Sequence, residues 1–159
     1  MTPILRHSSQ QKRHGERGAS LVEFALVAPL LLILLFGIME SGWSFSHLLE
    51  VRHGAREGAR LVATAGDDPL WATDALVTAE VCDRMHFSGD ETMTTVTITM
   101  PAGRDIGDHV EVMVSAPYNS LTGFTSQFFG NLTLDSTVEV RLEQVPAAGL
   151  GTGAPQTCP

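Results

Sequence analysis

The apolar run from Leu21 to Trp43 constrains the fold of this chain more than any other feature of its sequence. Its centre, from Phe24 to Met39, contains no charged side chain. A helix over this run would be roughly 35 Å long, at about 1.5 Å per residue, and a hydrocarbon core is about 30 Å thick. The residues that follow are too few to bury such a helix on all sides, and the run is too long for a removable secretory signal. We therefore predict a retained single-pass transmembrane helix over residues 19–45.

Charge is distributed unevenly around this helix. Residues 1–18 carry four Lys or Arg and one Glu, whereas residues 19–159 carry six Lys or Arg and seventeen Asp or Glu. We expect residues 1–18 to be a basic cytoplasmic leader and the C-terminal domain to be extracytoplasmic, in line with the positive-inside rule. Because an acidic body repels phosphate, nucleic acid is not an expected partner.

The entrance to the helix carries a short motif. Gly18 follows basic residues, Ala19 comes next, and Glu23 stands five positions after the glycine. Glycine leaves the backbone bare for a protease, and we expect Gly18 to interrupt the helix at the membrane surface. A glutamate in an apolar segment is costly, so Glu23 is expected to have a partner. The alternative is a loop glycine followed by an interfacial charge.

This motif resembles the type III signal of type IV prepilins, which a prepilin peptidase cuts after the glycine. That resemblance implies cleavage between Gly18 and Ala19, and pairing of Glu23 with the freed amine of Ala19 on a neighbouring subunit. Further residues indicate which family of prepilin-like proteins the chain resembles. They are a Val-Glu-Phe-Ala start at 22–25, then Pro29, then Glu40 at the end of the span, then Ala-Arg-Glu-Gly-Ala-Arg at 55–60.

In this order, over residues 17–62, the pattern resembles the TadE-like pseudopilins of the bacterial tight-adherence (Flp pilus) system. Ser41 departs from it, because the family usually has an aromatic residue there. The resemblance implies a minor pilin-like subunit that takes part in assembling the pilus or its secretion apparatus. Its implied partners are the prepilin peptidase, other pilin subunits, the Tad assembly machinery and the membrane. The downstream family positions are Pro29, Glu40, Arg56, Glu57, Gly58 and Arg60.

Helical periodicity continues beyond the membrane over residues 46–65. Apolar residues recur there at spacings of three and four, and small residues one turn apart predict close packing. Arg52, Arg56 and Arg60 form a stripe, in which Glu57 can pair with Arg60. Two interpretations of the stripe stay open: a solvated face with weak ion pairs, or a contact with acidic partners or lipid headgroups.

Residues 66–145 are predicted to form an extracytoplasmic α+β domain. Asp68 and Pro69 suit the start of a second helix that runs from Leu70 to about His86. Apolar and polar residues then alternate near 95–100, 110–114 and 132–142, which predicts about three antiparallel strands with one face covered by the helices. The expected fold is pilin-like, with the long helix packed on this small sheet. Residues 146–159 are expected to be a flexible tail.

Cys82 and Cys158 are the only cysteines. Outside the cytoplasm they can form a disulfide, and free thiols or a bridge to another chain are the alternatives. No catalytic motif, metal-ligand spacing or phosphate loop is present, so we expect neither an enzyme nor a cofactor or metal site. A second functional hypothesis is an unprocessed, membrane-anchored binding or adhesion module. Its contact surface would be the sheet and the loop 118–130, which contains Phe124, Phe128 and Phe129.

Overall fold

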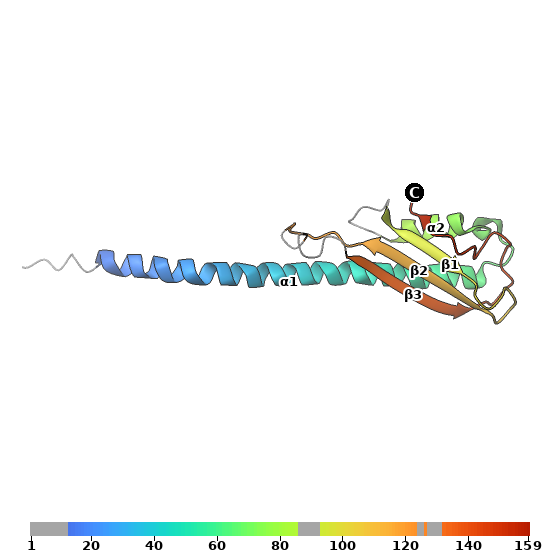
Figure 1. The fold of residues 1–159 in the computed structure, drawn as a ribbon, viewed down its shortest axis with the longest axis horizontal. Coiled ribbons are helices and arrows are strands. Elements are labelled where there is room, and N and C mark those ends of the chain that lie inside the picture. The colour runs from blue at the N-terminus through green and yellow to red at the C-terminus, as the bar shows by residue number, and fades with distance from the viewer. Residues whose placement is uncertain (1–12, 86–92, 124–125, 127–131) are drawn as a thin grey trace, which may run out of the picture. The chain divides into compact units, whose positions relative to one another are not determined.

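The computed structural model describes residues 13–85, 93–123, 126 and 132–159 of the chain (Figure 1). It divides into two compact units, Met1–Met39 and Glu40–Pro159. The first helix, α1 (Arg13–Thr64), contributes to both units.

The first unit contains the apolar half of α1. Every large apolar side chain from Leu21 to Met39 is exposed, with Phe24 at 70% and Leu26 at 74%. A soluble helix rarely leaves so large an apolar surface uncovered. By its length and composition, this one helix in the described part of the chain could cross a membrane. Pro29 lies inside α1, as does Gly18, because the helix already begins at Arg13.

The predicted interruption at Gly18 is therefore not what the structure shows. A single glycine lowers helix stability by about 1 kcal/mol relative to alanine. That cost is too small to break a helix that continues on both sides of Gly18.

The second unit is an α+β domain whose sheet has four antiparallel strands in the order β3-β2-β1-β4 (Figure 1). The strands are β1 (Thr95–Thr99), β2 (His109–Pro117), β3 (Thr133–Arg141) and β4 (Gln156–Thr157). The register places Val112 of β2 opposite Ile98 of β1 on one side and Val138 of β3 on the other. The predicted α+β class, with a long helix on an antiparallel sheet, is confirmed.

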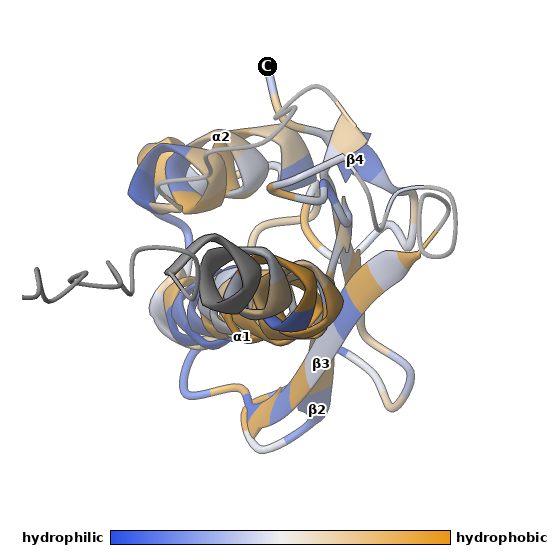
Figure 2. Cartoon of the chain, turned by 90° about the vertical axis from the view of Figure 1, so that its left-hand side faces the viewer, coloured by the Kyte–Doolittle hydropathy of each residue, from blue (hydrophilic) through white to orange (hydrophobic). Residues whose placement is uncertain are grey.

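The core lies between one face of this sheet and two helices, the outer part of α1 and the short α2 (Asp74–Arg84) (Figure 2). Alternate residues of β1 and β2 point into it, so that Val96, Ile98, Val110, Val112 and Val114 are fully buried. From α1 the core receives Val51, Ala55, Ala59 and Val62, which are also fully buried. The predicted face of small and apolar residues on residues 46–65 is the face that packs here.

The second helix begins later than predicted. Residues Pro69–Trp71 form a 3₁₀ turn that Asp68 caps, because its carboxylate accepts a hydrogen bond from the Leu70 backbone at 2.9 Å. Thr73 then caps a separate α-helix, α2, by accepting from Leu76 at 3.4 Å. A polar capping residue four positions into the expected helix thus splits it in two.

The C-terminal segment also differs from its prediction as a flexible tail. Leu150 is fully buried, Cys158 is 6% exposed, and β4 pairs with the edge of β1. The carboxylate of Asp74, at the start of α2, accepts hydrogen bonds from the backbone of Gly151 at 2.7 Å and Thr152 at 3.0 Å. Gly149 sits where an added Cβ would lie 2.6 Å from the carbonyl oxygen of Ala72. Glycine serves close packing here, not mobility.

Candidate functional site

The junction residues of the first unit lie on an open helix surface. Gly18, Ala19 and Glu23 are all exposed, and a Cβ added at Gly18 would meet nothing within 4 Å. No contact inside the described chain therefore requires glycine at position 18.

Glu40 begins the second unit and is buried, with 7% of its surface exposed. Its Oε1 accepts a hydrogen bond from the Tyr118 hydroxyl at 2.6 Å and from the Leu121 backbone at 3.2 Å. Its Oε2 accepts from the Thr122 hydroxyl at 3.1 Å and from the Thr122 backbone at 3.4 Å. A buried carboxylate needs such donors, because an unpaired one would be expensive.

The same segment contacts the next turn of α1. The indole N–H of Trp43 donates to the Asn119 carbonyl at 3.0 Å, and the Ser44 hydroxyl lies 2.8 Å from the Tyr118 hydroxyl. Burial raises the pKa of Tyr118, and its hydrogen bond to Glu40 raises it further. Glu40 therefore fastens residues 118–122, which follow β2, to α1.

Two glycines in the 54–60 segment let α1 approach its neighbours closely. A Cβ added at Gly58 would lie 3.1 Å from side-chain atoms of both Val112 and Val81. One added at Gly54 would lie 2.1 Å from the sulfur of Met85. Ala55 and Ala59 are fully buried beside them. The small residues of the 54–60 segment thus allow α1 to pack against both β2 and α2.

The charged residues of the same segment divide into two groups. Glu57 accepts two hydrogen bonds from the guanidinium of Arg60, at 2.6 Å and 3.1 Å, and also pairs with Arg84 of α2. The hydrogen bond from Arg60 is the main cause of the lowered pKa of Glu57, and burial opposes it. Arg56, by contrast, is exposed and forms no ion pair with any residue that the structure describes.

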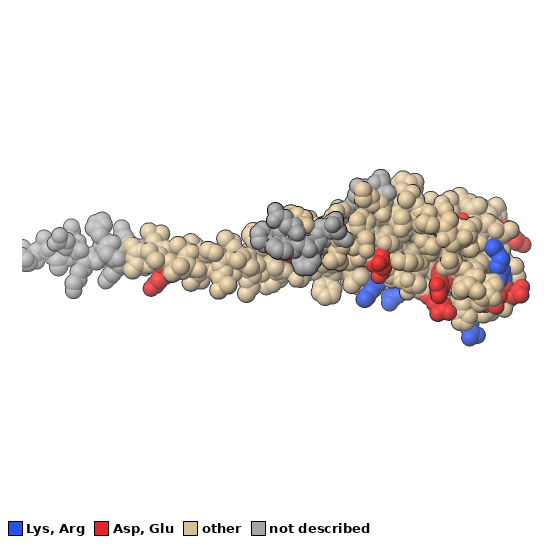
Figure 3. Space-filling model, viewed as in Figure 1, with Lys and Arg blue, Asp and Glu red and all other residues tan. Residues whose placement is uncertain are grey.

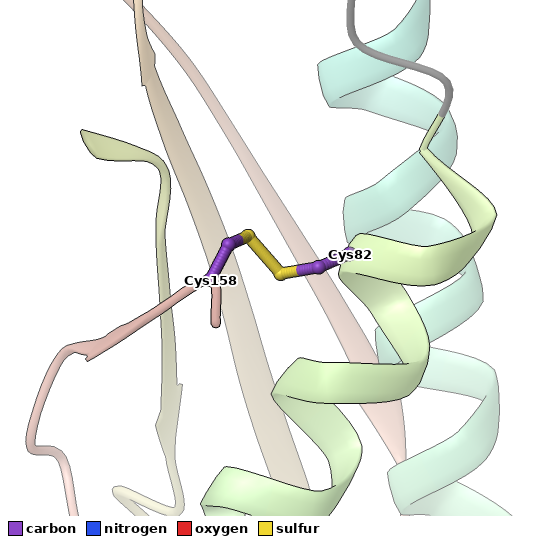
Figure 4. The surroundings of a disulfide bond; sticks show 2 residues. All are labelled: Cys82 and Cys158. Atoms are coloured by element: carbon purple, nitrogen blue, oxygen red, sulfur yellow. A yellow bond between two sulfur atoms is a disulfide. The ribbon is translucent and has the colours of Figure 1, made fainter. Parts of the chain in front are cut away.

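A disulfide joins Cys82 of α2 to Cys158 in the C-terminal segment, across a sequence separation of 76 residues (Figure 4). Its Cα atoms are 5.8 Å apart. Together with Asp74 and β4, this bond holds the C-terminal segment against α2 and β1.

The structure brings some predicted site residues together and leaves others apart. Cys82 meets Cys158, and Glu57 meets Arg60, whereas Gly18, Ala19 and Glu23 lie in the other unit. The partners of Glu40 were not anticipated, although Tyr118 is the only tyrosine in the chain and stands directly after a strand. Part of the predicted contact loop, including Phe124, Phe128 and Phe129, lies outside the described residues. In the described ranges, no three His, Cys, Asp or Glu side chains are grouped to hold a metal ion.

Comparison with known proteins gives one match. The family model described as TadE-like protein matches residues 18–60, from the junction glycine to the last arginine of the 55–60 segment. No curated protein and no solved structure matches the chain. The resemblance predicted from the sequence is therefore confirmed, and residues 18–60 of this chain are similar to TadE-like proteins.

Proposed function

We propose that this chain is a non-enzymatic, pilin-like structural subunit of the Tad (Flp pilus) system, cut after Gly18 by a prepilin peptidase. The observation that carries the proposal is the match of residues 18–60 to TadE-like proteins, which begins at the glycine of the proposed cut. The open surface around Gly18 supports it, because a peptidase would have free access to this bond.

In this proposal the leader 1–18 is cytoplasmic, α1 crosses the membrane, and the unit Glu40–Pro159 is extracytoplasmic. The disulfide between Cys82 and Cys158 supports this orientation, since disulfides persist in oxidising compartments and are rare in the cytoplasm. Cleavage would leave an amine on Ala19, and the exposed carboxylate of Glu23 would pair with that amine on a neighbouring subunit. An ion pair of this kind offsets the cost of a charge in an apolar segment.

Processing is tested by expressing the full chain in cells with and without a prepilin peptidase and measuring the intact mass of the membrane-extracted protein. We expect a mature chain that begins at Ala19 only when the peptidase is present. Gly18→Ala should block the cut without disturbing the fold. Gly42→Ala is the matched control, because Gly42 is another α1 glycine whose added Cβ would meet nothing within 4 Å.

A chain that keeps residues 1–18 in the presence of an active peptidase would contradict the processing step and favour the anchored binding module. Assembly is tested separately with Glu23→Ala. That variant should be inserted and cut normally but should reduce the number of surface pili, while Glu143→Ala, a change at an exposed carboxylate of the other unit, should not.

A further inference from the structure

An exposed stripe runs along α1 on the side away from the core of the second unit. Its members recur every three or four residues, so they share one helix face. Phe45 and Leu49 on this face are 66% and 62% exposed, and the Arg60 side chain is 63% exposed. Neither Arg52 nor Arg56 has an acidic partner among the described residues. We call this set the arginine stripe: Phe45, Leu49, Arg52, Arg56 and Arg60.

The sheet carries the opposite charge on its outer face. Residues of β2 and β3 that point away from the core include Glu111, Asp135 and Glu139, and also His109 and Arg141 at one end of the two strands, so this face is acidic on balance. Figure 3 shows acidic side chains on the second unit, together with some basic ones. Met113, 37% exposed, lies on this face between them. We call Glu111, Met113, Asp135 and Glu139 the acidic face.

The acidic face has an internal electrostatic cost. Glu111 and Glu139 stand directly opposite each other in the β2–β3 register, and like charges in such a pair are destabilising. The side chain of His109 contacts Glu139 at 2.6 Å, but Glu111 has no ion pair among the described residues. A cation supplied by another molecule would relieve this repulsion.

The spacing of the two surfaces is compatible. Arg52 and Arg60 are separated by two helical turns, roughly 12 Å. Asp135 and Glu139 are four strand residues apart, roughly 14 Å. A helix laid along β3 therefore places its arginines beside carboxylates over the same length.

The two surfaces belong to different layers of the domain, because α1 covers the inner face of the sheet and the acidic residues are on the outer face. Among the described residues, no ion pair joins the arginine stripe to the acidic face within one copy. Between copies the contact is heterologous, since it joins two different surfaces, and a heterologous contact can repeat without closing.

We propose that the arginine stripe of one copy docks on the acidic face of a second copy of this chain. The inference rests on the proposed function, since a repeating contact is what a filament or pre-filament cluster needs. Exposed ion pairs are individually weak, so this contact contributes mainly to the orientation and register of the two copies. The high effective concentration of one copy near the other comes from their anchoring in the same membrane.

Zero-length cross-linking tests this contact in the full chain. Lys12 is the only lysine in the sequence, so Arg56→Lys introduces one amine into the second unit while keeping the positive charge. A mixture of ¹⁵N-labelled and unlabelled copies in phosphatidylcholine vesicles is treated with a carbodiimide, and the linked peptides are mapped by mass spectrometry. We expect mixed-isotope links from position 56 to Glu111, Asp135 or Glu139, and the same result with Arg52→Lys.

The matched control is Ala79→Lys, which places an amine at an exposed position of α2 outside the arginine stripe. It should give at least fivefold fewer mixed-isotope links to the acidic face. Adding Glu111→Gln and Glu139→Gln to Arg56→Lys should reduce the links by a similar factor.

Absence of mixed-isotope links from both position 52 and position 56 would overturn the proposal. Links to other carboxylates only would also overturn it. Links that form in phosphatidylcholine but disappear when anionic phosphatidylglycerol is added would assign the stripe to lipid headgroups instead, because the headgroups would then displace the acidic face. Because the vesicles contain neither a peptidase nor assembly machinery, these outcomes are independent of whether the chain is processed at Gly18.

Discussion

The carboxylate of Glu40 and the hydroxyl of Tyr118 are joined by a 2.6 Å hydrogen bond across 78 positions of sequence. Both residues are 7% exposed. Glu40 begins the second unit, and Tyr118 directly follows β2. The bond thus fastens the end of a central strand to the long helix.

Tyr118→Phe is expected to lower the free energy of unfolding by about 1.5–3 kcal/mol, because a buried carboxylate loses a donor and the ring is retained. Urea unfolding of the full chain in detergent, followed by the fluorescence of Trp43 and Trp71, measures this change. Asn119→Ala is the control, since Asn119 contacts Trp43 only through its backbone carbonyl. Equal unfolding midpoints for Tyr118→Phe and the wild type would contradict a stabilising role for the bond.

A second expectation concerns pH. The pKa of Glu57 is lowered from its ordinary value of 4.5, chiefly by the hydrogen bond from Arg60. A carboxylate with a depressed folded-state pKa adds stability above its unfolded-state pKa and loses it as the pH falls through the folded-state value. Glu57→Gln should therefore be less stable than the wild type at pH 7, and the difference should shrink below pH 4.5.

Thermal unfolding of both proteins from pH 7 down to pH 3 measures that difference. The matched change is Glu143→Gln, at an exposed carboxylate without an ion pair in the described part of the chain. A stability gap that stays constant over this range for Glu57→Gln would show that the ion pairs with Arg60 and Arg84 do not cause it.

Patterns that repeat along the chain were sufficient to predict most of the fold. The uncharged run from Phe24 to Met39 identified the apolar helix, and alternating Thr and Val identified β1. These signals are local, because every residue on one face of an element meets the same environment. The α+β class followed from counting such elements.

Contacts between distant single residues were not predictable in the same way. The partners of Glu40 lie about 80 positions away, and Asp74 holds a segment that begins 77 positions later. No periodicity marks such pairs. The prediction of a flexible C-terminal segment is wrong because its Gly, Pro and Ala content is typical of linkers, while its order depends on Leu150, Asp74 and the disulfide.

Loss of the disulfide is expected to be costly. Closing a loop of 76 residues contributes about 4 kcal/mol in the loop-entropy model. Cys82→Ser should lower the free energy of unfolding by up to this amount, and treatment of the wild type with a reductant should have the same effect. The double variant Cys82→Ser/Cys158→Ser is the control, because it should not respond to the reductant. Equal stability of oxidised and reduced wild type would contradict the expectation.

Asp74 helps to order the C-terminal segment. The Asp74 carboxylate is 3% exposed and accepts hydrogen bonds from the amides of Gly151 and Thr152 and from the Thr152 hydroxyl. Asp74→Ala removes all three, and each lost bond to a charged group is worth about 1.5–3 kcal/mol. The disulfide still ties Cys158 to α2. We therefore expect Asp74→Ala to increase local opening of the C-terminal segment rather than global unfolding of the domain.

Hydrogen–deuterium exchange measures that opening. The amides of Gly151 and Thr152 should exchange at least tenfold faster in Asp74→Ala, since a loss of about 1.4 kcal/mol corresponds to a factor of ten. Amides of β2 should keep their rates, because β2 lies at the centre of the sheet. Asp83→Ala, at an exposed position of the same helix, is the control. Equal protection of residues 151 and 152 in the wild type and Asp74→Ala would mean that burial of Leu150 and the disulfide alone order this segment.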